Sequence, residues 1–434
     1  MTHAALSLAQ TPPLSVPLRF FLTAPLFAMA CGIILFWAGP DAFSSRWHPA
    51  LLAATHFLTL GFLTMIMIGA LQQLTPVLMG AQISHPVLFS TVIHLLLSAG
   101  TLALAGGWLW HKVGLFTLAG ILLGLASTGF ILVLLITLRK AHSGHVTVRS
   151  TKVALTAFAV TSVLGVYLAL GYSWNGLERL PGMTDQHMTW GLVGWVSLLI
   201  MGVAYQVVPM FQITPNYPRL MMRWFTTAIL LLLLCWSLVQ VFLPDEIWIL
   251  QLTEGLLAFT LMCFLVVSLN LLSRRRRRVP DVTLNFWHVS LSCLLLAIIV
   301  WSLSLTDIGD RLGLLFGVLM IAGFSMSAVS GMLYKIVPFL IWLHLNNYIQ
   351  GKDRTRGMIP NMKQIIPERN VCLHFRAHNL MLLLSFLAVF WPDYFLRPAA
   401  LLLIVTSTIL FRNLYSALHL YNHMGIQRVA SCQE

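Results

Sequence analysis

Histidines inside long apolar segments are the residues of this chain with the clearest potential for chemistry. The chain has 15 histidines among 434 residues. A neutral imidazole binds haem iron, copper or zinc through a ring nitrogen, and an ionisable side chain within a membrane-length segment is costly and usually functional. Eight such histidines are more than interhelical hydrogen bonds require, so we predict a haem b group. The eight are His56, His94, His187, His288, His374, His378, His419 and His423.

Depth restricts which histidines can pair, because two imidazoles on one haem iron must face each other at one level. At a rise of about 1.5 Å per residue, His56 lies about 9 Å inside the outer boundary of its segment. His187 lies at that boundary, so the two share a site only if the segment of His187 begins earlier. His288 and His378 lie about 8–9 Å from the inner boundary by the same rise, and His94 is close to mid-membrane.

Spacing along a helix adds further candidates. His374 and His378, and likewise His419 and His423, are i,i+4 pairs that share a helix face. Arg412 precedes His419 by two helical turns and lies on the same face. Its guanidinium would hold haem propionates or a quinone headgroup, or alternatively would reach to the inner interface of the membrane.

Other side chains suggest proton or metal chemistry. Glu254 is the one acid well within an apolar segment, and it would serve as a proton relay, an ion site or a partner for a buried base. Copper is a second candidate metal, because copper(I) accepts thioether sulfur, although most of the 19 methionines serve packing. The methionines concerned are Met65, Met67 and Met79. The six cysteines form no C-x-x-C pair, which argues against disulfides, c-type haem attachment and a zinc site.

The composition places these residues in a membrane. The chain is 58% hydrophobic and 9% charged, with a mean hydropathy of +0.85, whereas soluble domains carry about 25% charged residues. The net charge of +13 comes from short basic clusters between apolar runs, which indicates membrane topology rather than nucleic-acid binding. We predict an all-α integral membrane protein with twelve helices that cross the lipid bilayer. Their ranges are 18–38, 50–78, 86–109, 113–138, 151–172, 187–211, 221–243, 247–272, 283–304, 312–342, 373–391 and 397–421.

Loop charges predict the orientation. Every second loop is basic: 139–152, 219–223, the five-arginine run 274–278 and the long loop 343–372. The loops between them are acidic or weakly charged, with Glu178, Asp185, Asp245, Glu246, Asp307 and Asp310. Basic loops face the cytoplasm, so we expect both termini to be cytoplasmic.

A motif recurs three times, in the second, sixth and tenth apolar segments. The pattern G-x7-G-x2-[Q/Y]-[Q/K]-x2-P starts at Gly61, Gly194 and Gly323. Small residues let neighbouring helices approach closely, and the proline bends or ends the helix. We therefore predict three four-helix repeats: 1–150, 151–280 and 281–434. In each copy of the motif two polar residues precede the proline. The second residue of each pair would lie near the inner face, and the three would surround a pseudo-threefold axis and form a polar relay. These second members are Gln73, Gln206 and Lys335.

Three four-helix arcs with a histidine in the second helix resemble subunit I of the haem–copper oxidases. The segment His-Phe-Leu-Thr-Leu-Gly at 56–61, followed by Gly-Ala-Leu-Gln-Gln-Leu-Thr-Pro at 69–76, looks like that of shorter subunit-I-like proteins and the neighbouring NnrS family of haem-containing nitric-oxide-response proteins. The resemblance implies that His56 is a haem ligand and His187 a metal ligand. The seventh segment lacks a histidine pair and the tenth has only His344, so the binuclear oxygen-reducing centre is not carried over.

The resemblance implies a haem protein of the bacterial inner membrane that acts in electron transfer or in nitric oxide or oxygen chemistry or response. If it is an enzyme, it would be an oxidoreductase. The resemblance also implies a cytochrome or a quinol as electron donor, a diatomic gas as ligand, and assembly into a homo- or hetero-oligomer. A secondary transporter or metal carrier is the alternative, although transporters usually repeat in halves of five or six helices. The third hypothesis is an accessory subunit of a respiratory complex that docks on its partner through residues 343–372.

Overall fold

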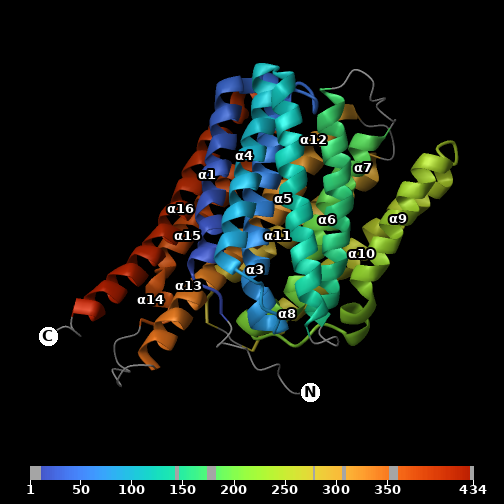
Figure 1. Ribbon diagram of the computed structural model, residues 1–434. Coiled ribbons are helices and arrows are strands. Elements are labelled where there is room, and N and C mark those ends of the chain that lie inside the picture. Colours follow the sequence, from blue (N-terminus) through green and yellow to red (C-terminus); the bar gives the residue numbers. More distant parts are fainter. Residues whose placement is uncertain are drawn as a thin grey trace.

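The computed structural model describes residues 11–141, 146–173, 182–276, 279–304, 309–350 and 360–430. Within these residues all regular structure is helical, and twelve helices are long and apolar enough to cross a membrane (Figure 1). This confirms the predicted fold class. The spans are Ser15–Phe43, Pro49–Met79, Pro86–Trp110, Val113–Arg139, Val146–Gly171, Met183–Gln212, Met221–Phe242, Ile247–Ser273, Val282–Leu303, Arg311–Asn346, Glu368–Phe390 and Pro392–Met424.

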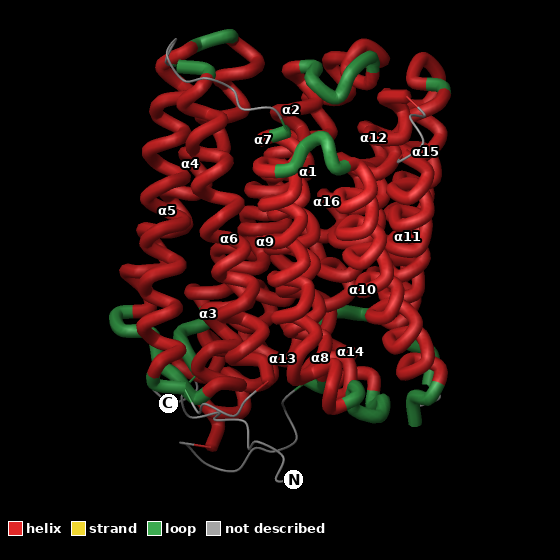
Figure 2. The backbone as a smooth tube through the Cα atoms, turned by 90° about the vertical axis from the view of Figure 1, so that its right-hand side faces the viewer, coloured by secondary structure: helices red, strands yellow, loops and turns green. Residues whose placement is uncertain are grey.

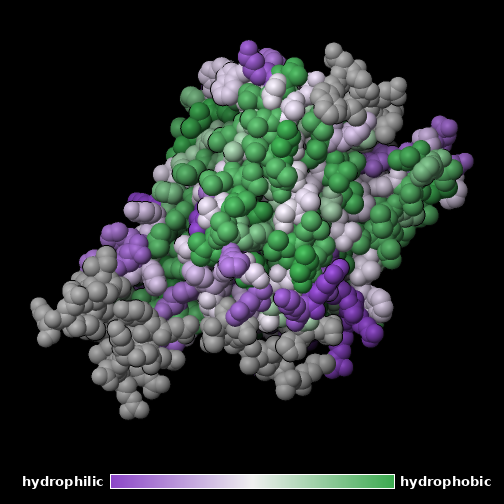
Figure 3. Space-filling model, in the orientation of Figure 1, coloured by the Kyte–Doolittle hydropathy of each residue, from purple (hydrophilic) through white to green (hydrophobic). Residues whose placement is uncertain are grey.

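The helices run side by side, and the loops gather at two ends (Figure 2). Helices α1 (Ser15–Ala38) and α16 (Pro392–Ala430) pack against each other, so the first and last spans are neighbours. Helix α1 begins and helix α16 ends at the same end of the bundle, as an even number of spans requires (Figure 1). Apolar side chains cover the sides of the bundle, and hydrophilic residues gather toward its ends (Figure 3). The chain is therefore a multi-pass membrane protein.

The predicted boundaries differ from the helices where polar residues continue a span. The sixth span begins at Met183 rather than 187, and the eleventh at Glu368 rather than 373. The last eight residues of helix α13 (Ser327–Gln350) and all of helix α14 (Met362–Ile365) fall within 343–372, so that predicted loop is partly helical. Hydropathy detects only the apolar part of a helix. Of the predicted charged loops, residues 142–145, 178, 277–278, 307 and 351–359 lie outside the described part of the chain.

Four of the spans contain a π-helical segment that hydropathy did not predict. One segment is η5 (Met221–Phe225), and the other three lie in the spans that carry the motif. These three are η3 (Phe57–Thr64), η4 (Trp190–Ser197) and η6 (Leu319–Met326), and the first glycine of the motif is the fifth residue of each. In η4 and η6 a serine hydroxyl donates to the carbonyl five residues earlier, with an oxygen–oxygen distance of 2.7 Å. Such widened turns are rare and are often found at functional sites.

The motif glycines allow close helix packing. A Cβ on any of the six would lie 2.4–3.0 Å from an atom of the span before it in the chain. The six neighbours lie seven residues apart on α1, on α6 (Val146–Gly171) and on α11 (Val282–Ser304). The pairs are Gly61–Phe27, Gly69–Phe20, Gly194–Ala157, Gly202–Ser150, Gly323–Cys293 and Gly331–Phe286. The packing explains the glycines, while the grouping of the whole chain into three repeats stays a prediction.

Candidate functional site

A large cavity lies in the half of the bundle away from the termini. Its volume is about 780 Å³, and it reaches the polar residues between α1 and α2 (Pro49–His56). Side chains from α4 (Pro86–Trp110), α6, α7 (Met183–Thr189) and the π-helical segments line it, most of them aliphatic or aromatic. His56 and His187 both face this space, so the structure brings together two of the predicted site residues.

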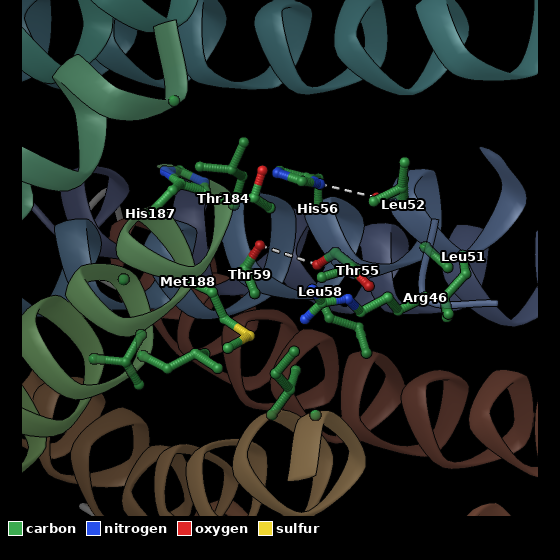
Figure 4. A pocket seen from close by; sticks show the side chains of 18 of the residues that line it. Arg46, Leu51, Leu52, Thr55, His56, Leu58, Thr59, Thr184, His187 and Met188 are labelled. Atoms are coloured by element: carbon green, nitrogen blue, oxygen red, sulfur yellow. Dashed lines mark hydrogen bonds between the residues drawn. The ribbon is translucent and has the colours of Figure 1, made fainter. Parts of the chain in front are cut away.

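The two imidazole rings are arranged in line. Their centroids are 6.3 Å apart and their planes differ by 12°. Figure 4 shows the rings edge to edge, with the hydrogen bond from His56 to Leu52 leaving from the side away from His187. His187 reaches this position because its helix begins at Met183, which meets the condition that the sequence set for a shared site.

Backbone carbonyls fix the protonation of both rings. Nδ1 of His56 donates to the carbonyl oxygen of Leu52 at 2.8 Å, and Nδ1 of His187 donates to that of Thr161 at 3.1 Å. A carbonyl oxygen only accepts, so each Nδ1 carries the proton, and in the neutral ring Nε2 keeps its lone pair. Histidines that bind metals commonly donate their other ring N–H to a backbone carbonyl in this way.

Two neighbours that the sequence did not single out hold the rings in place. The indole of Trp108 packs on His56, with ring centroids 4.8 Å apart. A Cβ at Gly165 would lie 2.8 Å from Cε1 of His187, so the ring occupies space that only glycine leaves open. Neither residue belongs to a recognisable motif. Only the spatial arrangement reveals their roles.

The dimensions fit a metal held between two imidazoles. Imidazole–metal bonds are about 2.0–2.1 Å, so rings that bind opposite sides of one metal have centroids about 6 Å apart. The observed separation is 6.3 Å. The cavity falls within the range of about 300–1,000 Å³ that is usual for small-molecule and cofactor sites. Its mainly apolar lining suits a macrocycle such as haem.

Charged groups lie at the edge of the cavity. Arg46 pairs with Asp185 at 3.1 Å, and both side chains line the cavity and are about 40% exposed. Glu254, predicted as a relay residue, also lines the cavity and accepts a hydrogen bond from the indole of Trp236 at 3.1 Å.

The remaining predicted ligands lie elsewhere. His94 shares a hydrogen bond of 2.9 Å with the Thr23 hydroxyl and does not line the cavity. Four others are exposed on the outside of the bundle: His288 on α11, and Arg412, His419 and His423 on α16. His378 is fully buried, but it lies beside His374 in a different part of the bundle. Among the described residues, no group of three or more histidines, cysteines or acids forms a metal site.

The three residues of the predicted polar relay differ in their surroundings, and the relay itself stays a prediction. A small cavity of about 30 Å³ separates the three motif helices α3 (Met65–Met79), α8 (Leu198–Gln212) and α13, and Gln73 lines it. Gln206 and Lys335 do not line it. Lys335 instead pairs with Asp281 at 2.6 Å.

Asp281 lies just outside the ninth span. Burial alone raises the pKa of its carboxyl group. The hydrogen bond and charge of Lys335, together with hydrogen bonds from Thr283, outweigh burial and hold the pKa below its ordinary value. This ion pair joins the loop before α11 to the motif helix α13 and has a structural part to play.

Comparisons with known proteins do not assign the chain. No family model matches it, and a search of curated proteins found no significant match. The resemblance to the haem–copper oxidases therefore stays a prediction. What the site can do follows from the two facing histidines, their carbonyl-bonded Nδ1 atoms and the apolar cavity that surrounds them.

Proposed function

We propose that the chain is a haem b protein of the bacterial inner membrane in which His56 and His187 bind the iron from opposite sides. One observation carries the proposal: the two imidazoles lie in line at 6.3 Å, each with Nδ1 bonded to a carbonyl, beside a cavity of about 780 Å³. The bound haem supplies reversible one-electron chemistry.

Arg46 is the residue best placed to meet the haem propionates. It lines the same cavity as the two histidines, and Figure 4 shows it on the segment leading into α2. Guanidinium groups bind carboxylates in a bidentate manner. Arg412, which the sequence suggested for this part, is exposed on α16 and does not line the cavity.

Two protein ligands favour electron transfer over gas chemistry. A haem iron with imidazoles on both faces has no open coordination position, so a diatomic gas would bind only by displacing one of them. We therefore propose a membrane oxidoreductase component that passes electrons from a cytochrome or quinol donor. Glu254, on the same cavity, would exchange a proton when the charge at the site changes.

A metal carrier is the second candidate, and the same ring separation favours it. Two imidazoles at this distance would also hold a single copper or zinc ion without a macrocycle. Metal content therefore has to be measured together with the optical spectrum. Copper or zinc without haem would support the carrier.

The test is a reduced-minus-oxidised spectrum of the full chain purified in detergent, with a pyridine haemochrome assay and metal analysis. We expect one b-type haem per chain that does not respond to carbon monoxide. His56→Ala and His187→Ala should each lose haem or open one axial position to carbon monoxide. His94→Ala is the matched control, because His94 is also within a span but does not line the cavity.

Two results would contradict the proposal. One is a chain free of haem after expression with ample haem precursor. The other is a double variant, with both His56 and His187 replaced, whose haem spectrum equals that of the unmodified protein.

A further inference from the structure

A second pair of histidines lies buried on α15 (Glu368–Phe390), away from the haem site proposed above. His374 and His378 are one helical turn apart, both fully buried, and their ring centroids are 6.0 Å apart. Two histidines at i and i+4 on one helix face are a common way to chelate a metal ion. The other such pair, His419 and His423, has centroids 6.4 Å apart but is exposed on α16.

The buried pair lacks the hydrogen bonds that buried polar groups need. Both ring nitrogens of His374 and Nδ1 of His378 have no partner. The Ser330 hydroxyl and the side-chain oxygen of Asn413, on the neighbouring helices α13 and α16, also have none. At least 90% of buried polar groups in proteins are paired, so three unpaired ring nitrogens indicate a partner that is not part of the chain.

The surroundings orient one of the rings for a metal. Nε2 of His378 lies 2.8 Å from the Ser327 hydroxyl oxygen. If this nitrogen donates its proton to Ser327, Nδ1 keeps a lone pair, which is the arrangement of a ligand supported by a hydrogen bond behind it. The rings of Phe286 and Tyr334 pack on the pair, with Phe286 5.5 and 5.7 Å from the two imidazoles and Tyr334 5.5 Å from His374. The pair therefore lies in a buried position beside aromatic rings.

We propose that His374 and His378 bind a single copper(I) ion, with Nδ1 of His378 as one ligand. Imidazole suits copper and zinc, so charge selects between them. Among the described residues no acid or cysteine completes the group, and an uncompensated charge in an apolar interior is costly. A monovalent ion costs less there than a divalent one.

The large cavity comes close to this site. Met381 and Ser385, on the same helix as the pair, line that cavity. Met381 is one turn from His378 and Ser385 is two.

The test titrates the purified full chain with copper(I) under a reductant, in competition with a copper(I) chelator. The starting variant carries His56→Gln, His419→Gln and His423→Gln, which removes the other two pairs of imidazoles. We expect it to bind one copper(I), with nitrogen ligands in the X-ray absorption spectrum. Adding His374→Gln or His378→Gln should abolish that binding while the gel-filtration profile is kept.

Ser327→Ala provides a milder variant that keeps both ligands. Loss of the hydrogen bond behind His378 should weaken copper(I) binding about 10–100-fold. Absence of copper binding in the starting variant would mean that water molecules satisfy the unpaired nitrogens, and it would overturn the proposal. Copper retained after His374→Gln, or zinc(II) bound as tightly as copper(I), would overturn it as well. None of these results depends on haem at His56 and His187.

Discussion

Adding one carbon atom at Gly165 should disturb the proposed haem site without replacing either of the proposed ligands. Gly165 lies on α6 beside the imidazole of His187, and in Gly165→Ala the new Cβ would stand 2.8 Å from Cε1 and 3.4 Å from Nδ1 of that ring. Ordinary van der Waals contact begins at 3.4 Å. The ring must therefore retreat by about 0.6 Å, since interiors are too closely packed to absorb such an overlap elsewhere.

The retreat carries the ring away from the carbonyl that orients it. Nδ1 of His187 is already 3.1 Å from the Thr161 oxygen, and N–H···O bonds normally end at about 3.2 Å. Loss of such a supporting bond typically lowers metal affinity about 10–100-fold, which corresponds to about 1.4–2.7 kcal/mol. We expect Gly165→Ala to bind haem more weakly by this factor and to open one axial position to carbon monoxide.

The assay measures the rate and extent of haem loss to an excess of a haem-scavenging protein, together with the carbon monoxide difference spectrum. Gly171→Ala is the matched control, because it adds the same atom to the same helix and has nothing within 4 Å of the new Cβ. If Gly165→Ala and Gly171→Ala held haem equally well, His187 would not be the ligand that the geometry indicates.

Three further predictions concern the scaffold. Gly202→Val should force α6 and α8 apart, because even a Cβ would lie 2.6 Å from Cβ of Ser150. We expect the free energy of unfolding to fall by about 1–3 kcal/mol and the melting temperature in detergent to fall with it. Gly114→Val is the control, because Gly114 lies in open space, and it should leave the melting temperature unchanged. Asp281→Asn should cost about 1–3 kcal/mol at neutral pH by leaving Lys335 without its partner. The folded state depresses the pKa of Asp281 below its ordinary 3.8, so its stabilisation is complete above that value and is lost as the pH falls through the folded pKa. The melting temperatures of the variant and the unmodified protein should converge as acid protonates Asp281, and a difference that persists after this carboxyl group is protonated would argue against the ion pair. A reporter domain fused to either end of the chain should report a cytoplasmic location. A periplasmic location at either end would contradict the orientation expected from the basic loops.

The spans could be predicted from the sequence because the hydrocarbon thickness of a bilayer fixes how long an apolar helix must be. Most boundaries agree within a few residues. Some shifts fall where a polar turn continues a helix, as at Met183 and Glu368. The π-helical segments could not be predicted, since a change in hydrogen-bond register leaves the apolar pattern intact.

The residue types of the candidate site could be predicted from the sequence. Whether each side chain faces lipid or the interior of the bundle could not. A helix in a bilayer can be apolar all round, so hydropathy does not separate the side that faces lipid from the side that faces protein. His288 and Arg412 consequently appeared as candidates although both are exposed. His56 and His187 could be named from the sequence. Their shared depth depends on where the sixth span begins, and its first helix, α7, begins at Met183.

The widened helical turns and the histidines have separate origins. The three π-helical segments in the motif spans place a motif glycine at the same position, yet only two of them follow a histidine closely. His56 directly precedes η3 and His187 lies three residues before η4, whereas Val318 precedes η6. A histidine is therefore not what creates the widened turn. In the motif helices the widened turn contains a glycine that packs on the neighbouring helix, and two of these helices also carry a histidine close to that turn. The third motif helix lacks such a histidine, and the buried pair near it comes from α15 instead.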